Sequence, residues 1–381
     1  MKTTAPAASD ARAEIAHLVR TTPPLPAWIF TWEGWDRYVR TEFNPPDLLD
    51  CAPADVEVDE DDPRVDYHRH LLMIDTAFLK GCLLRARGTF GVNGSRYEGL
   101  LDMVIDGPAG TGKTYLLRLI GRELQRRVEK HFSDRVPVVH ITVPHDPENE
   151  LNWIWEIASF LALTPEPKSE GEARQLRRIP DLSLPVRAVL ERKQTRLLLV
   201  DDIQRVSPGQ LGPILHYFDY LRTRLGITTI FCGTGATDIV HAARKGCDRR
   251  DDALWTAHQR LQPKATTTEL RAAVAKEQNV RSLLPVTWVD PLPYSDDAEG
   301  QAPFLTVLKG YEKNLRMRKL SKDVLTRHAQ YLHDRTGGYF LYLSQLICGA
   351  TVAGILDGTE DITLDHLQAI RIGREEILPG H

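Results

Sequence analysis

The sequence of 381 residues lacks the features that mark several large protein classes. No apolar run approaches the roughly 18–20 residues that a membrane-spanning helix needs. The first 15 residues contain no apolar stretch of the kind found in a secretory signal. No internal repeat and no long low-complexity tract is present. We therefore expect a cytoplasmic protein with no membrane segment, and the length predicts two or three domains.

Cysteine is also scarce and scattered. None of the cysteines forms a Cys-x-x-Cys pair, and none has a histidine at the spacing of a metal ligand. This distribution argues against a disulfide framework and against a structural zinc site, so we expect reduced thiols. The five cysteines are Cys51, Cys82, Cys232, Cys247 and Cys348.

Charge is unevenly distributed, although the net charge is only −4. Residues 1–62 hold 5 Lys and Arg against 13 Asp and Glu, a balance of −8, so the remainder carries +4. Eight of these acids and no base lie between Asp47 and Asp62, which predicts a solvated, mobile linker. The remainder is mildly basic, which alone does not establish DNA binding.

An aromatic cluster precedes the acidic run. Because exposure of so many aromatic rings to water would be costly, we expect this segment to dock on the rest of the chain, with docking on a partner as the alternative. The cluster comprises Trp28, Phe30, Trp32, Trp35, Tyr38 and Phe43.

Short apolar strands alternate with helices between residues 101 and 289. This alternation is typical of a parallel sheet that is covered on both faces. The expected strands are 101–106, 136–143, 196–201, 227–232 and 286–289, and the expected helices between them include 115–132, 147–163 and 211–225. Before the first strand we expect one helix over 67–84, followed by a turn-rich stretch marked by Gly88, Gly91, Gly94 and Gly99.

From residue 302 onward the pattern indicates only helix, with a strong helix over 339–356. The predicted fold class is α/β, with a five-stranded parallel sheet between helices and a small all-α C-terminal domain. We expect an N-terminal extension over residues 1–62, an α/β core over 63–300 and a helical domain over 301–381.

One passage matches the P-loop pattern G-x-x-x-x-G-K-[ST] and lies between a predicted strand and a predicted helix, as that motif requires. Its glycines allow backbone N–H groups to surround phosphates, and the helix after it directs its positive end at the anion. Lysine reaches the β- and γ-phosphates, and the threonine hydroxyl binds Mg²⁺. We therefore expect ATP to bind Gly107, Pro108, Ala109, Gly110, Thr111, Gly112, Lys113, Thr114 and Tyr115.

Acidic residues follow the apolar run Leu197–Val200. In an open α/β sheet the ligand lies at the carboxyl ends of the strands, so Asp201 should reach the nucleotide. We expect Asp201 and Thr114 to hold the Mg²⁺ ion between them.

These passages together resemble the TniB/TnsC-type AAA+ ATPases of transposons, over roughly residues 63–370. The resemblance rests on YHRHL at 67–71, GPAGTGKT at 107–114, the strand and helix passage 138–163, LLLVDDIQ at 197–204 with IFCGTGATDIV at 230–240, and TGGYFLYLSQL at 336–346. It implies an AAA+ core followed by a helical lid.

The resemblance also implies roles for residues that the P-loop pattern does not contain. Asp202 stands where AAA+ enzymes usually have a glutamate that activates water, and its shorter side chain predicts slow turnover. Thr234 stands at the sensor position that contacts the γ-phosphate or the attacking water. In this family an arginine also reaches the nucleotide of a neighbouring subunit. The candidates are Arg249, Arg250, Arg260 and Arg281, and we place Arg260 with Asp202 and Thr234 among the expected catalytic residues.

The function that the resemblance implies is regulation of DNA transposition. ATP-bound subunits would assemble on duplex DNA as a ring or helical filament, recruit a transposase and a target-selector protein, and disassemble on hydrolysis. Basic residues at 118–130 and 316–319 could follow a phosphate backbone, or could equally be a solvated charged surface.

Two other functions remain open. A replication initiator or helicase loader would normally add a winged-helix domain after the lid, and the 25 residues after Leu356 are too few for one. A nucleotide-gated signalling or defence switch that binds no nucleic acid would usually carry a repeat array or an effector domain.

Overall fold

The computed structural model describes residues 29–42, 44–53, 56, 58–70, 74–96, 100–164, 181–247, 269, 284–295 and 297–373. Within them, five parallel strands form one sheet in the order β2-β3-β4-β1-β5. This confirms the predicted parallel five-stranded sheet. The strands are β1 Met103–Asp106, β2 Val138–Thr142, β3 Leu197–Asp201, β4 Thr228–Cys232 and β5 Val286–Trp288.

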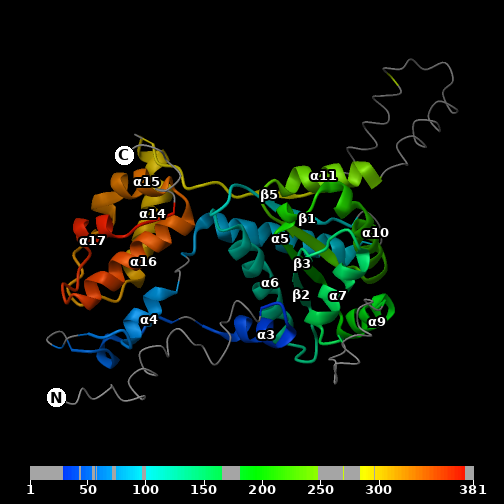
Figure 1. Ribbon diagram of the computed structural model, residues 1–381, viewed down its shortest axis with the longest axis horizontal. Helices are drawn as coiled ribbons and strands as arrows, with labels where there is room; N and C mark the ends of the chain where they lie inside the picture. Colours follow the sequence, from blue (N-terminus) through cyan, green and yellow to red (C-terminus); the bar gives the residue numbers. More distant parts are fainter. Residues whose placement is uncertain are drawn as a thin grey trace, which may run out of the picture.

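Helices flank the sheet and also form a separate group after it (Figure 1). The α-helices are α3 Trp32–Arg40, α4 Pro63–Arg69, α5 Ala77–Ser95, α6 Lys113–Glu129, α7 Glu150–Phe160, α9 Ser183–Lys193, α10 Pro208–Leu225, α11 Ala236–Cys247, α14 Ala298–Asn314, α15 Ala329–Thr336, α16 Phe340–Leu356 and α17 Leu364–Ala369. Single 3₁₀ turns are η1 Leu48–Asp50, η2 Ile203–Arg205 and η3 Thr326–His328.

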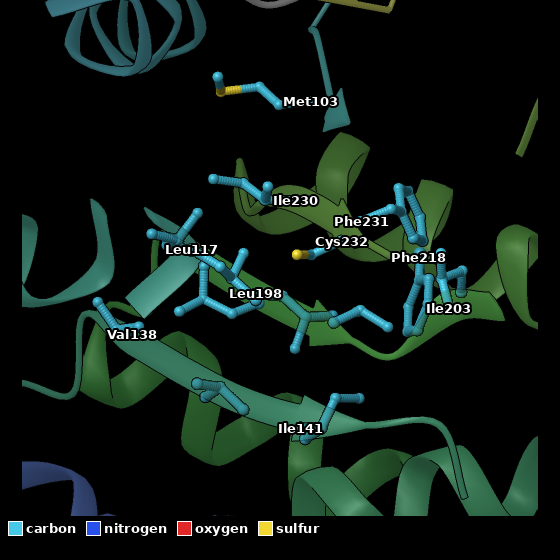
Figure 2. Close-up of a cluster of buried hydrophobic side chains, with 14 of the residues drawn as sticks. Met103, Leu117, Val138, Ile141, Leu198, Ile203, Phe218, Ile230, Phe231 and Cys232 are labelled. Carbon is cyan, nitrogen blue, oxygen red and sulfur yellow. The ribbon is translucent and has the colours of Figure 1, made fainter. Parts of the chain in front are cut away.

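The central strands are buried along their whole length, which explains their near-continuous apolar sequence. Side chains of neighbouring strands and of the helices that cover them meet in one hydrophobic cluster. Figure 2 shows part of it, where Leu198, Ile230 and Phe231 of the sheet lie near Leu117 of α6 and Phe218 of α10. This packing holds the carboxyl ends of β1, β3 and β4 beside one another.

Helix α10 begins and ends at residues that commonly cap helices. Ser207 caps its first turn, with the Ser207 hydroxyl accepting from the Gln210 N–H and the Gln210 side chain accepting from the Ser207 N–H. Pro208 occupies the first helical position, where its missing N–H costs nothing. Gly226 ends the helix in the left-handed region at φ 67°.

The C-terminal helices α14 to α17 form a second hydrophobic cluster, away from the sheet (Figure 1). This matches the expected small all-α domain. Helix α16 supplies its centre, because Leu343, Leu346 and Ile347 are fully buried. None of the helices in the described part of the chain has the length and apolar character that crossing a membrane would require.

The aromatic N-terminal segment docks on the chain itself. Trp35 and Val39 of α3 are fully buried in the cluster around the sheet, and Phe30, Trp32 and Tyr38 pack against it. The expectation of docking on the rest of the chain is therefore confirmed for these residues. Trp28 and Phe43 lie outside the described residues.

The prediction that the acidic run is a solvated linker was wrong at Asp62. For the rest of the run it stays a prediction, and the other described acids, Asp47, Asp50, Asp59, Glu60 and Asp61, are exposed. Asp62 is buried, caps α4 through the Arg64 N–H, and pairs with the Arg64 guanidinium at 3.0 Å. Arg64 also reaches Glu360 at 2.7 Å, and all three side chains are at most 2% exposed. The buried Arg64 guanidinium therefore pairs with two carboxylates, one at the end of the acidic run and one near the C-terminal helices.

Helix α4 packs on α16 and adds Val65 and Tyr67 to the C-terminal cluster, not to the sheet. The domain division at residue 63 stays a prediction, but this helix lies with the C-terminal helices (Figure 1).

The prediction of a single helix over 67–84 was also wrong. Helix α4 ends at Arg69, and α5 begins at Ala77, after Thr76 caps it by accepting from the Leu79 N–H. The supposed turn glycines Gly88, Gly91 and Gly94 lie inside α5, while Gly99 lies outside the described residues. A Cβ at any of these three positions would meet nothing within 4 Å, so they face open space.

Candidate functional site

The loop from Gly107 to Gly112 joins β1 to α6 in a conformation that requires glycine. Gly107, Gly110 and Gly112 have φ values of 141°, 80° and 95°. A Cβ on Gly107 would lie 2.2 Å from the carbonyl oxygen of Val289, the residue after β5, so this close approach excludes other residues there. No side chain in the described part of the chain caps α6, so its first N–H groups are available to an anion.

Lys113 is buried at the start of α6 and points back across the loop. Its Nζ donates to the Pro108 carbonyl at 2.6 Å and to the Thr234 hydroxyl at 3.2 Å. Burial lowers the pKa of Lys113, while the nearby Asp106, Asp201 and Asp202 carboxyls oppose that shift. A phosphate beside Nζ would favour the charged form in the same way.

Thr114 and Asp201 meet across the site. The Thr114 hydroxyl donates to Asp201 Oδ1 at 3.1 Å, which joins the first turn of α6 to the carboxyl end of β3. Asp201 is only 4% exposed, and burial raises the pKa of its carboxyl. The sequence predicted these two residues as a pair, and the fold brings them together.

Asp202 lies at the rim of the same site in the left-handed region, with φ 61° and ψ 33°. Aspartate tolerates this conformation better than most residues. Its Oδ1 accepts from Gln204 Nε2 at 3.0 Å, and its Oδ2 pairs with Arg205 at 3.1 Å.

Thr234 lies in the turn after β4, beside both Lys113 and Gln204. Its hydroxyl accepts from Lys113, and its N–H donates to Gln204 Oε1 at 3.3 Å. The loop places Thr234 where it can contact a phosphate that Lys113 binds.

Asp106, at the carboxyl end of β1, was not singled out from the sequence, although it is 1% exposed. Its Oδ1 accepts from the Gly107 N–H at 2.6 Å and the Gly235 N–H at 2.8 Å, and its Oδ2 accepts from the Thr237 N–H at 2.8 Å. Burial alone would raise the pKa of this carboxyl, but these hydrogen bonds outweigh burial and lower it. Asp106 therefore ties the P-loop to the loop that carries Thr234. An acid at the carboxyl end of an apolar strand, as with Asp201, is the sequence pattern from which its role could have been predicted.

A cavity of about 350 Å³ lies between the P-loop, the ends of β3 and β4, and the start of α16. The Leu341 N–H donates to the Gly110 carbonyl at 3.0 Å, so α16 closes directly on the P-loop. No sequence signal marked this contact. The lining residues are Ala109, Gly110, Gly112, Lys113, Thr114, Asp201, Asp202, Gln204, Gly233, Thr234, Phe340, Leu341 and Ser344.

Other residues predicted to bind nucleotide lie behind this lining. Thr111 is buried, and its hydroxyl donates to the Pro108 carbonyl at 2.9 Å. Tyr115 packs against the cluster around the sheet, and burial raises the pKa of its hydroxyl to about 12. Contact of these residues with a nucleotide stays a prediction. Arg249, Arg250, Arg260 and Arg281 all lie outside the described residues.

Several basic residues that could have followed a phosphate backbone are engaged within the chain. Arg122 donates to the carbonyls of Val39 and Thr41, and Arg126 donates to Val39. Arg318 donates to the carbonyls of three residues between positions 48 and 52. These arginines hold the N-terminal segment, so they are poor candidates for DNA contacts.

Comparison with known proteins supports the fold. Residues 101–238 match a family model described as an AAA domain. The chain is similar to the Aeropyrum pernix ORC2 protein in ADPNP-ADP complexes, with 15% identity, a TM-score of 0.50, and coverage of 84% of this chain and 75% of that one. It is also similar to the Aeropyrum pernix ORC1 protein in complex with DNA, with 17% identity, a TM-score of 0.48, and coverage of 82% and 67%.

Curated protein sequences give no significant match. The AAA domain match and the likeness to the ORC2 protein, together with the parallel sheet, show that the chain has the P-loop AAA+ fold. At these identities the likeness concerns the fold alone.

Proposed function

We propose that the protein binds ATP with Mg²⁺ and hydrolyses it, and that the bound nucleotide controls its assembly on duplex DNA during transposition. The observation that carries the first part is the contact of Thr114 with Asp201 beside the P-loop, at 3.1 Å. Three features of an ATP site thus converge: a glycine cradle, a buried lysine and a hydroxyl–carboxylate pair.

The residues present suit Mg²⁺, which prefers hard oxygen ligands and usually takes only one or two protein carboxylates. Asp201 is buried, so a cation beside it would offset the cost of its charge. Thr114 and Asp201 would hold the ion. When bound, Mg²⁺ neutralises charge that develops on the phosphates.

The chain's own groups divide the remaining work. Lys113 would bind the β- and γ-phosphates, Thr234 the γ-phosphate, and Asp202 would orient the attacking water. The Asp202 side chain is one methylene shorter than glutamate, so we expect slow turnover. An arginine from a neighbouring subunit, with Arg260 as first candidate, would complete the site and make assembly depend on ATP.

Replacement of Lys113 by alanine tests the nucleotide site. Lys113→Ala removes the buried cation from the phosphates, so both ATP binding and hydrolysis should be abolished. Binding is measured by fluorescence anisotropy of a labelled ATP analogue, and hydrolysis by phosphate release. Lys80→Ala, at an exposed position on α5, is the control that should match the parent. If Lys113→Ala bound and hydrolysed ATP like the parent, the site would be misassigned.

The role in transposition is supported by the resemblance to TniB/TnsC-type ATPases across the P-loop, the strand ends and the lid. A replication initiator or helicase loader is the second candidate, because the likeness to the ORC2 protein shows a shared fold and does not distinguish the two functions. Pull-down with a transposase encoded beside this gene, in ATP and in ADP, separates the two. ATP-dependent capture favours transposition, and loading of a replicative helicase favours the alternative.

A further inference from the structure

A continuous row of contacts leads from the phosphate-binding lysine to the acid at the rim of the site. Lys113 Nζ donates to the Thr234 hydroxyl at 3.2 Å. The Thr234 N–H donates to Gln204 Oε1 at 3.3 Å, and Gln204 Nε2 donates to Asp202 Oδ1 at 3.0 Å. One amide side chain therefore joins the loop after β4 to the acid after β3.

The loop after β4 passes directly against Gln204. A Cβ on Gly233 would lie 2.3 Å from Gln204 Oε1 and 2.8 Å from Ile203 Cγ2, so glycine is needed for this approach. The far end of the same loop is fixed by Asp106, which accepts from the N–H groups of Gly235 and Thr237. With one end held, a shift of Thr234 is passed to Gln204.

Gln204 suits this position because an amide has both an acceptor and a donor. Its oxygen accepts from the backbone of Thr234 while its nitrogen donates to the carboxylate of Asp202. A carboxylate or a thioether at this position could not make both bonds. Arg205 also pairs with Asp202, but its side chain is 63% exposed, and none of its contacts in the described part of the chain reaches the loop after β4.

We propose that Gln204 is a positioning residue that couples the γ-phosphate contact at Thr234 to the orientation of the Asp202 carboxylate. The inference rests on the ATPase activity proposed above. Contact of Thr234 with the γ-phosphate fixes the loop, the loop fixes the Gln204 amide, and the amide holds Asp202 in the orientation that aligns water. With ADP, which has no γ-phosphate, this coupling is lost.

The test is steady-state ATP hydrolysis by Gln204→Met, which keeps the length of the side chain and loses both hydrogen bonds. Misplacement of a catalytic group by about 1 Å can cost about a hundredfold in rate, so we expect kcat to fall by about tenfold to a hundredfold. ATP affinity should stay within about threefold, because the P-loop contacts remain. Gln204→Glu keeps the acceptor but places a charge beside Asp202, so its kcat should fall as well.

Gln330→Met is the matched control, because Gln330 is also exposed and its Nε2 also donates to an aspartate, Asp334, at 2.8 Å. This variant should hydrolyse ATP at the parent rate. Thermal unfolding of Gln204→Met should match that of the parent, which separates positioning from folding.

A double-mutant cycle decides whether Gln204 acts through Asp202. Asp202→Asn alone should lower kcat, and adding Gln204→Met to it should lower kcat no further. Independent, multiplicative losses would overturn the inference, as would a parent-like kcat for Gln204→Met. If the parent itself hydrolysed no ATP, the proposed function would fail first, and the inference with it.

Discussion

Three aspartates lie at strand ends beside the cavity, and differences in burial and hydrogen bonding suit each of them to a different role. Asp106 accepts three backbone N–H groups, which lower its pKa despite burial, so it is a fixed anion within the fold. Asp201 is also buried, but among the described residues its carboxyl accepts from one backbone N–H, that of Asp202 at 3.0 Å, and burial raises its pKa. Such a carboxylate gains most from an added cation, which suits a metal ligand. Asp202 at the rim contacts the exposed side chains of Gln204 and Arg205.

Replacement of Asp106 by asparagine tests its role as the anchor of both phosphate-contacting loops. An asparagine would place an NH₂ group opposite at least one of the N–H donors, whichever way the amide is turned. A buried donor without a partner costs about 1–3 kcal/mol, so the free energy of unfolding should fall by that amount. ATP affinity should fall as the P-loop loosens. Denaturant unfolding and anisotropy of labelled ATP measure the two effects.

Asp102 offers a control for Asp106→Asn, since it is equally buried but lies before β1, away from the cavity. Asp102→Asn should destabilise the fold, because it loses charge against Arg222 and Arg244, yet leave ATP affinity of the folded protein unchanged. Equal loss of ATP affinity in both variants would mean that Asp106 contributes only to folding.

At the scale of single elements, helix α6 combines two functions along its length. Its first turn holds Lys113 and Thr114 at the phosphate site, while its later turns carry the N-terminal segment. Arg122 and Arg126 donate to carbonyls at the end of α3, where a helix leaves acceptors unpaired. Trp35 of α3 lies against Gly121, midway along α6.

Replacement of Gly121 by alanine tests this packing. In a helix interior this change normally stabilises by about 1 kcal/mol. Here the new Cβ would lie 2.7 Å from Leu199 Cδ1 and 2.9 Å from two ring carbons of Trp35. Overpacking of that kind costs about 1–3 kcal/mol, so the free energy of unfolding should decrease. Gly88→Ala in α5, where nothing lies within 4 Å, should instead stabilise. If both changes stabilised, α3 would not pack on α6 in solution.

The elements that sequence predicted well are those whose pattern is local. All five strands were predicted to within a few residues. The reason is clearest for β1, β3 and β4, which are buried throughout and therefore mostly apolar, whereas only the middle residue of β5 is buried. The P-loop was predicted because its glycines, lysine and threonine form a contiguous motif. Helix α5 was misread because Gly88, Gly91 and Gly94 resemble turn signals, although the helix continues through them.

The features that sequence missed depend on contacts between distant segments. Asp62 belongs to an acidic run, and its burial became visible only when Arg64 and Glu360 were placed beside it. Gln204 ends the passage LLLVDDIQ, but its contact with Thr234, 30 residues further along, is not visible in that passage. Leu341 reaches the P-loop from more than 200 residues away in the chain. Local patterns carry no information about such pairs.

At the scale of the whole molecule, the N-terminal segment touches both parts of the fold. Helix α3 packs on α6 beside the sheet, and α4 packs on α16 among the C-terminal helices (Figure 1). The candidate nucleotide cavity lies between the same two parts, because α16 supplies Leu341 and Ser344 to it. A movement of α16 relative to the P-loop would therefore also change the distance between the two places where this segment packs.

Nucleotide-dependent DNA binding is the prediction that concerns the whole molecule. It is motivated by the resemblance to TniB/TnsC-type ATPases and by the net charge of +4 beyond residue 62. Several subunits assembled by ATP would multiply weak phosphate contacts, so binding should require ATP or a slowly hydrolysed analogue. Affinity should fall with salt, with a log–log slope of about −0.9 per neutralised phosphate, and depend little on sequence.

To test DNA binding by charge reversal, the basic side chains that are replaced should be ones that do not hold other parts of the chain in place. Arg318 holds the N-terminal segment, whereas Lys319 and Lys322 are exposed on the same C-terminal domain. Lys319→Glu with Lys322→Glu should weaken binding and lower the salt slope by about 2, because two phosphate contacts are lost. Lys80→Glu is the control, because it makes the same lysine-to-glutamate change at an exposed position on α5. Fluorescence anisotropy on a duplex of several helical turns, at two salt concentrations in ATP and in ADP, provides the measurement. No binding in ATP at low salt would exclude the transposition role and favour a signalling switch, and equal binding in ADP would remove nucleotide-controlled assembly.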